Sequence, residues 1–276
     1  MAKKKKKPSI VTLWIAFIIA IVSYATGQSW MEKETSPTDT QKETVQQADA
    51  PLMEIPVMDA KKQGQVLYRT GYTLSYDPKT KTPQWVAWEL TKKETNGQEE
   101  RSDKFQPDPD VKGAQVVTTD YSNTGYDRGH MAPAADMKWS KKAMQESFYM
   151  SNICPQNHHL NTADWGELEK KSRQWARRYG KVHIVCGPLY LGKRKEYIGK
   201  NRVKVPDAFF KVVLINHAKK QVALGFLFDN ESGERPLTAY LTSVDKIEKM
   251  TGMDFFSALP DELENRLEKE IPEELP

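Results

Sequence analysis

The chain of 276 residues has only two cysteines, Cys154 and Cys186, and they do not form a CxxC pair. No cysteine and histidine spacing suits zinc, so the sequence excludes zinc fingers and related structural zinc sites. In an oxidising compartment the two cysteines could form one disulfide or stay as buried free thiols. The sequence leaves both states open.

Charge is missing from one long stretch near the N-terminus. After Lys3–Lys7, no charged residue appears up to Met31, and Ile10–Val22 is strongly apolar. A basic flank before an apolar run is typical of an export signal, because basic residues stay on the cytoplasmic side. We predict that residues 1–27 are a signal peptide or an uncleaved membrane anchor, and that the protein is periplasmic, membrane-anchored or secreted. Residues 28–60 have few large apolar groups and are predicted to be a polar linker.

The sequence also lacks an internal repeat and a regular alternation of strands and helices, which favours an α+β fold. In the run 84–90, Val86, Trp88 and Leu90 alternate, as expected for a half-buried strand. The other predicted elements are strands within 66–76, 181–188, 209–216 and 221–228 and helices within 140–150, 162–180 and 241–259. We place the folded domain at 61–260. Acidic residues predominate in 261–276, which is predicted to be an acidic tail with a frayed helix.

One histidine has neighbours that suit phosphate chemistry. His130 lies in the stretch YDRGHMAPAAD, directly after Asp127, Arg128 and Gly129. A neutral histidine can take a proton from water near pH 7, and the planar fork of an arginine can hold phosphate oxygens. Gly129 would let the backbone turn tightly between them. By itself, the stretch could equally be a surface turn that contains an ion pair.

A second group of motifs lies downstream, in SNICPQNHHLNTADWGELE from Ser151 to Glu169. The order D-R-G-H, S-N-I-x-P-Q, L-N and W-x-x-L-E resembles the sugar-nonspecific ββα-metal endonucleases, a family of DNA/RNA non-specific (His-Me finger) nucleases. The resemblance extends over about Tyr68–Leu259 and includes GPLY and VPDAFFKVV. It implies an α+β fold with a central antiparallel sheet flanked by helices.

The resemblance also implies roles for individual residues. His130 is expected to be the general base that deprotonates water, and Asn161 the single protein ligand of Mg²⁺, for which Mn²⁺ or another divalent ion could substitute. Glu169 is expected to orient the water shell of the metal. Arg128 is expected to hold the phosphate, with Arg101 as a second candidate.

Several assignments stay open or secondary. Lys104 and Arg69 compete with Arg101 for the upstream arginine role, Asn152 is expected to support the histidine and metal site, and Asp127 to brace the motif. The adjacent histidines 158 and 159 lack acidic partners at a spacing that suits a metal site.

The distance between the two metal-side residues depends on the helix that carries them. In one continuous helix, Asn161 and Glu169 would be separated by about 12 Å along the axis, so both could not bind one ion directly. This geometry favours an outer-sphere role for Glu169. Asn161 could alternatively be a helix N-cap.

The implied reaction is metal-dependent hydrolysis of phosphodiester bonds in DNA and RNA, which leaves 5′-phosphate ends. No recognition helix or zinc finger is predicted, so contacts should be mainly to the backbone, with little sequence specificity. The net charge of +4 fits a polyanionic partner. Two alternatives remain: an exported nucleotide phosphodiesterase or pyrophosphatase on the same fold, and a non-catalytic DNA-binding protein tethered to the membrane. The N-terminal segment would contact the membrane if it is not cleaved.

Overall fold

A computed structural model describes residues 52–113, 115–231 and 233–276, which form one compact unit. The predicted signal or anchor, 1–27, and most of the predicted linker lie outside the described residues. Within the described part, no helix combines the length and apolarity that a membrane crossing requires.

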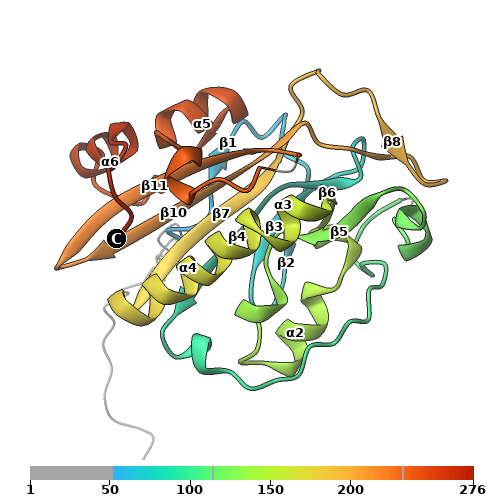
Figure 1. Cartoon of the computed structure of the whole chain (residues 1–276), viewed down its shortest axis with the longest axis horizontal. Helices are drawn as coiled ribbons and strands as arrows, with labels where there is room; N and C mark the ends of the chain where they lie inside the picture. The colour runs from blue at the N-terminus through green and yellow to red at the C-terminus, as the bar shows by residue number, and fades with distance from the viewer. Residues whose placement is uncertain (1–51, 114, 232) are drawn as a thin grey trace, which may run out of the picture. The chain divides into compact units, whose positions relative to one another are not determined.

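The centre of the domain is a seven-stranded sheet in which every neighbouring pair of strands is antiparallel (Figure 1). The strand order is β12-β11-β10-β7-β4-β3-β2. The bounds are β2 Gln65–Tyr68, β3 Thr73–Asp77, β4 Thr82–Thr91, β7 Lys181–Leu189, β10 Ala208–His217, β11 Lys220–Asp229 and β12 Leu241–Thr242. The predicted α+β fold with a central antiparallel sheet is confirmed, and β10 and β11 form the predicted hairpin.

One face of the sheet is covered by α4 (Asp164–Tyr179), the helix predicted within 162–180. Gly180 follows α4 with a φ of 91°, a left-handed conformation that glycine adopts without a steric penalty. Trp165 and Leu168 are completely buried and pack in the same core as Val86 of β4. Ser140 caps the short helix α2 (Lys141–Ser147) by accepting a hydrogen bond from the backbone N of Ala143.

The second face of the sheet is covered as well, so the prediction of a half-buried strand at 84–90 is wrong. Trp85 and Ala87, which alternate with Val86 and Trp88, are buried in a separate core. This core includes residues of α5 (Val244–Thr251) and α6 (Asp261–Lys269). Figure 1 shows both helices, in red, on the opposite side of the β10 and β11 ribbons from α4.

Two elements extend beyond the predicted limits of the folded domain. Strand β1 (Val57–Met58) pairs with β13 (Met253–Asp254), and it precedes the predicted start at 61. The helix expected to fray is the ordered α6, in which Leu267 is completely buried against the sheet. The predominance of acidic residues concealed this apolar contact in the sequence.

The remaining elements connect the sheet to the site. A two-stranded antiparallel sheet, β5 (Tyr126–His130) with β6 (Ile153–Asn157), leads into α3 (His158–Thr162). A small hairpin is formed by β8 (Tyr197–Ile198) and β9 (Val203–Lys204). The 3₁₀ helices are η1 Glu94–Asn96, η2 Thr118–Tyr121, η3 Ala134–Asp136, η4 Met150–Asn152 and η5 Leu237–Tyr240.

Both cysteines are buried free thiols. The Cys186 thiol donates to the carbonyl of Met131, with 3.4 Å between Sγ and O, and burial raises its pKa to about 12. Of the two states that the sequence left open, the structure has the free thiols.

Candidate active site

The motif D-R-G-H lies in β5, and the antiparallel partner of this strand is β6, from the second motif. Gly129 pairs with Cys154, and His130 pairs with Ile153. The interpretation of Gly129 as a turn residue is wrong, because it lies within the strand. An added Cβ at this position would come within 2.1 Å of Oε1 of Gln156, so close packing against β6 requires the glycine.

His130 is at the end of β5 and only 9% of it is exposed. Its ring packs against Phe105 and Phe148, with centroid distances of 5.3 and 4.9 Å, and these two rings also contact each other at 5.0 Å. Within the described part of the chain, Nε2 is buried without a hydrogen-bond partner. Burial, together with the positive charges of Arg101 and Arg128, lowers the pKa of His130 to about 3. The imidazole is therefore neutral at pH 7, which is the form that can accept a proton.

Two arginines lie on the aromatic rings that enclose the histidine. The guanidinium of Arg128 is over Phe105, 4.6 Å from the ring centroid, and that of Arg101 is over Phe148 at 5.0 Å. Both arginines are exposed, and Nε of Arg101 is 2.5 Å from Oδ1 of Asp103. Two positive groups thus border the buried imidazole and are accessible to an anionic ligand.

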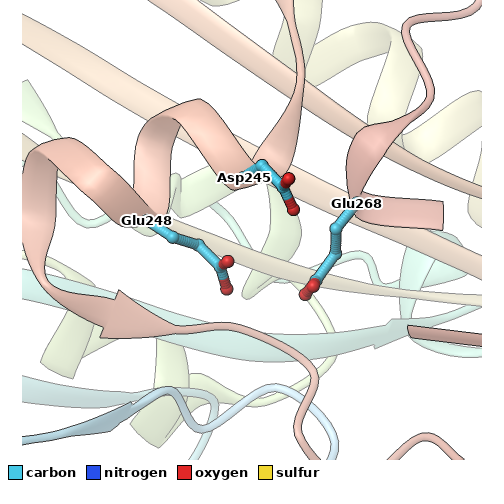
Figure 2. Close-up of side chains that lie close together, drawn as sticks. All are labelled: Asp245, Glu248 and Glu268. Carbon is cyan, nitrogen blue, oxygen red and sulfur yellow. The ribbon is translucent and has the colours of Figure 1, made fainter. Parts of the chain in front are cut away.

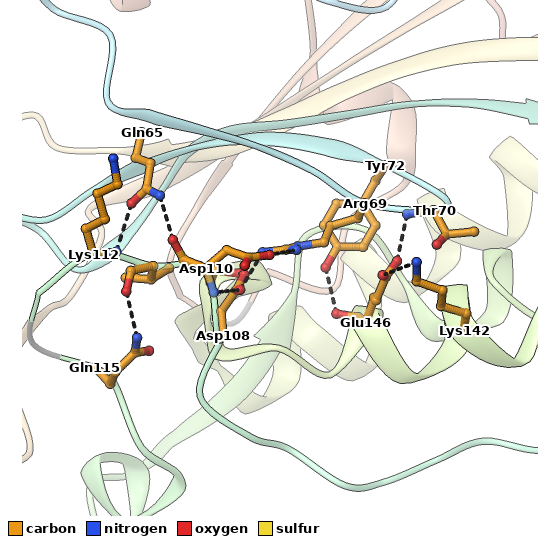
Figure 3. A network of polar contacts seen from close by, with 12 residues as sticks. Gln65, Arg69, Thr70, Tyr72, Asp108, Asp110, Lys112, Gln115, Lys142 and Glu146 are labelled. Carbon is orange, nitrogen blue, oxygen red and sulfur yellow. Dashed lines mark hydrogen bonds and ion pairs between the residues drawn. The ribbon is translucent and has the colours of Figure 1, made fainter.

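Of the two competitors for the role of Arg101, Arg69 is engaged elsewhere. Its guanidinium pairs with Asp108 and, at 2.5 Å, with Asp110, and only 6% of its side chain is exposed (Figure 3). It also lies over the ring of Tyr149, 5.2 Å from the centroid. Arg69 therefore anchors the segment 108–110. Lys104, the other competitor, is exposed.

Asn161 is held by Asp127. Nδ2 of Asn161 donates to Oδ2 of Asp127 at 2.8 Å, and Nδ1 of His158 is 2.9 Å from the same oxygen. The N-cap of α3 is Asn157, whose side chain accepts from two backbone nitrogens, so the alternative that Asn161 is an N-cap is wrong. Oδ1 of Asn161 has no hydrogen-bond partner among the described residues. A neutral amide oxygen of this kind suits a hard cation such as Mg²⁺.

Glu169 is in α4, whereas Asn161 is in α3, so the continuous helix considered above does not exist. Ala163 separates the two helices with φ −100° and ψ −95°, and the axial spacing estimated for a single helix does not apply. Glu169 is half-buried. Burial raises its pKa to about 7, although the charges of Lys211, Arg173 and Arg101 act in the opposite direction. Because the charge of Arg101 acts on both Glu169 and His130, the three residues share one electrostatic environment.

Asn152 fixes the chain directly after His130. Its Oδ1 accepts from the backbone N of Ala132, and its Nδ2 donates to the carbonyls of Ala132 and Ser147, each at 2.9 Å. The backbone carbonyl of Asn152 also accepts from Met131 N at 3.0 Å. All of Asn152 is buried. These bonds connect β5 to the start of β6.

The sequence reasoning missed the buried cation beside Glu169. Lys211 of β10 is 1% exposed, and its Nζ is 3.8 Å from the ring centroid of Trp165. The nearby Asp136 pairs with Arg173 at 2.7 Å. The sequence does contain a sign of this cation, because a lysine in the middle of the apolar run AFFKVVLI indicates a buried charge. Phe105 and Phe148 carried no comparable signal, because only the fold brings them to the histidine.

Comparisons with known proteins agree with this geometry. Residues 50–262 match the model of the family described as DNA/RNA non-specific endonuclease. The chain is 37% identical over 205 residues to "Endonuclease G, mitochondrial" of Homo sapiens, with 69% of each protein covered. It is 38% identical over 205 residues to "Nuclease EXOG, mitochondrial" of Xenopus laevis, covering 68% of this chain and 57% of that protein.

A solved structure shows the same fold. The crystal structure of the EndoG/EndoGI complex superposes with a TM-score of 0.67 at 31% identity, covering 71% of this chain and 87% of that chain. The α+β architecture with its ββα unit is thus that of a ββα-metal nuclease. The chain belongs to the DNA/RNA non-specific endonuclease family, and it is a nuclease that hydrolyses phosphodiester bonds of nucleic acids.

Proposed function

We propose that this nuclease is a metal-dependent endonuclease that cleaves DNA and RNA with little sequence specificity and leaves 5′-phosphate and 3′-hydroxyl ends. The observation that carries this proposal is the state of His130. Its Nε2 is buried and unpartnered among the described residues, and Arg101 and Arg128 lie beside the ring. A neutral base next to two phosphate-binding groups is the arrangement that hydrolysis of a phosphodiester requires.

The donor set fits a hard divalent ion. Asn161 would hold Mg²⁺, or Mn²⁺ in its place, through Oδ1, because Asp127 already occupies its amide nitrogen. Glu169 would be a second-sphere acid that orients water near the ion. When bound, the ion would neutralise the charge that develops on the phosphate and stabilise the leaving 3′-oxygen.

In the proposed mechanism, the residues of this chain position the phosphate and move one proton. Arg128 and Arg101 bind non-bridging oxygens of the phosphate and stabilise the pentacovalent state. His130 takes a proton from the attacking water, whose oxygen forms a bond to phosphorus in line with the leaving oxygen. The bond between phosphorus and the 3′-oxygen breaks, and the 3′-oxygen takes a proton from water to become the 3′-hydroxyl. Phe105 and Phe148 keep the imidazole fixed and shielded from bulk water. Asn152 keeps the backbone after His130 in place.

The proposed lack of sequence specificity follows from what the two arginines recognise. Phosphate groups are the same in every sequence, so contacts to them position the nucleic acid without reading it. Such binding weakens as the salt concentration rises. DNA and RNA are therefore the proposed substrates and partners, bound mainly through their backbones.

Comparing substrates separates this proposal from the alternative of a nucleotide phosphodiesterase or pyrophosphatase. We expect Mg²⁺-dependent nicking of supercoiled plasmid and degradation of single-stranded RNA, with 5′-phosphates that a ligase can join. Cleavage confined to a small diester or a dinucleotide would contradict the proposal. The other alternative, a non-catalytic DNA-binding protein, is not supported, because the chain belongs to a family of nucleases.

We also propose that residues 1–27 direct export, as a cleaved signal or as a membrane anchor. The basis is the sequence, in which five lysines precede an apolar run. N-terminal sequencing of the mature protein tests it: a new terminus near residue 28 indicates cleavage, and an intact N-terminus in the membrane fraction indicates an anchor. An intact N-terminus in the cytoplasm would contradict export.

A further inference from the structure

Five carboxylates gather on the sheet face that lies opposite α4. Asp245 and Glu248 come from α5, Asp254 from β13, and Glu264 and Glu268 from α6. The ligand oxygens of Asp245, Glu248 and Glu268 are all within 4.8 Å of one another, and the same holds for Asp254, Glu264 and Glu268. Figure 2 shows the first three side chains converging from the two helices.

Glu268 distinguishes this cluster from an ordinary acidic surface. It is only 6% exposed, and its Oε1 is buried without a hydrogen-bond partner within the described residues. Oε1 of Glu264 is buried and unpartnered in the same way. The carboxylate of Glu268 is directed at the two acids of α5 (Figure 2). A buried carboxylate oxygen without a donor is costly, unless a proton or a cation satisfies it.

In the described part of the chain the charge of Lys249 acts on Glu248, but it forms no ion pair with that residue. Among the described residues, none of the five acids forms an ion pair with lysine, arginine or histidine. Glu248 accepts one hydrogen bond, from the backbone N of Phe255 at 2.9 Å. Several carboxylates at this spacing, with buried oxygens that lack a donor among the described residues, form a set of oxygen ligands that a hard cation can satisfy.

We propose that Asp245, Glu248 and Glu268 form a binding site for a hard divalent cation, Ca²⁺ above all, with Glu264 and Asp254 adjacent to it. The set contains only oxygen ligands, which excludes the sites that soft metals prefer. Two oxygens bound to one Ca²⁺ at about 2.4 Å are separated by at most about 4.8 Å, whereas the limit for Mg²⁺ is only about 4.2 Å. The ligand oxygens all lie within 4.8 Å of one another, a separation that one Ca²⁺ can span. Ca²⁺ also binds through several carboxylates, whereas Mg²⁺ usually keeps several of its waters and takes one or two.

The ion has a structural consequence in this position. It connects α6 to α5, and the adjacent acids Glu264 and Asp254 lie beside it, the latter on β13, which pairs with β1. All these elements lie on the sheet face away from His130. Ca²⁺ at this site therefore stabilises the attachment of the C-terminal helix and does not take part in hydrolysis. Ca²⁺ binding at this cluster does not depend on the proposed function.

The test measures calcium binding by the full-length chain after treatment with EDTA. Isothermal titration at pH 7.5 should give one Ca²⁺ per chain, and the melting temperature should rise with the logarithm of the Ca²⁺ concentration above Kd. Combined with Asn161→Ala, which removes Ca²⁺ binding at the active site, Glu268→Gln should abolish both effects. Glu262→Gln, an exposed acid of the same helix, is the matched control and should bind Ca²⁺ like the wild type.

The active site could also bind Ca²⁺, so the titration is repeated with Asn161→Ala. We expect this variant to keep the Ca²⁺ site. If Ca²⁺ leaves the melting temperature of the wild type unchanged and produces no binding heat, the carboxylates are neutralised by protonation alone. The proposal is then wrong. A shift that persists in Glu268→Gln but disappears in Asn161→Ala would also contradict it. Should Glu268→Gln fail to fold, Asp245→Asn at the half-buried edge provides the same test.

Discussion

Asn152→Ala should impair both stability and catalysis, because Asn152 holds the backbone that follows His130. The substitution removes three buried side-chain hydrogen bonds, each of 2.9 Å. At about 1 to 1.5 kcal/mol for each bond, the loss is about 3 to 4.5 kcal/mol of unfolding free energy. The polar groups of Ala132 and Ser147 are left without these partners, which places the expected value in the upper part of this range.

Catalysis should respond in kcat more than in KM. Asn152 does not contact Arg128 or Arg101, which are proposed to bind phosphate, but it does hold the chain directly after the strand that carries His130. A displacement of the base by about 1 Å can reduce the rate by about 100-fold.

Urea denaturation and steady-state plasmid cleavage measure the two effects of Asn152→Ala. Asn96→Ala is the matched control, because Asn96 is exposed and its amide makes one long bond, of 3.3 Å, to the carbonyl of Lys92. The control should change the unfolding free energy by less than about 0.5 kcal/mol. If Asn152→Ala costs less than about 1 kcal/mol, or if it leaves kcat unchanged in a folded protein, the assigned supporting role is wrong.

Three further predictions concern the charges of the site. Arg128→Lys keeps the charge but loses the planar fork, so kcat/KM for plasmid nicking should fall by about 100-fold. An unchanged kcat/KM would show that Arg128 does not bind phosphate in the proposed way. The pKa of His130 is about 3 in the folded protein, below its ordinary value of 6.5, so the unfolded state binds more protons below pH 6.5 and stability declines as the pH falls. In urea denaturation between pH 6 and 4, the unfolding free energy of His130→Gln should fall less steeply with pH than that of the wild type, by about 1.4 kcal/mol per pH unit. Equal slopes for the two proteins would show that burial does not lower the pKa of His130. Lys211→Met should raise the pKa of Glu169 further above its ordinary value and move the acidic limb of kcat/KM to higher pH; an unchanged profile would show that Lys211 does not act through Glu169.

The sequence was sufficient where a local pattern determines the outcome. The helix at 162–180 has its apolar positions at helical spacing and a glycine at its end, and α4 follows this pattern. The hairpin of β10 and β11 was predicted from two apolar runs around a short polar turn. The family was predicted from short motifs in a fixed order, and the family match over residues 50–262 confirms it.

The remainder depends on contacts between residues that are distant in the sequence. Both faces of β4 are buried because α5 and α6, far downstream, cover the second face. The break at Ala163 depends on backbone angles that no residue type at this position dictates. Phe105 and Phe148 enclose His130 only after the chain has folded. The acidic residues of α6 suggested a solvated tail, but Leu267 makes the helix part of the core.

The most direct test of the central claim is single-turnover cleavage of supercoiled plasmid by the wild type and by His130→Ala, with and without Mg²⁺. DNA affinity is measured in parallel, without metal. The proposed role of His130 predicts Mg²⁺-dependent nicking by the wild type and a loss of at least about 100-fold in the rate of the variant, with DNA affinity retained. Nicking by His130→Ala at the rate of the wild type, or nicking by the wild type that persists in EDTA, would contradict the account.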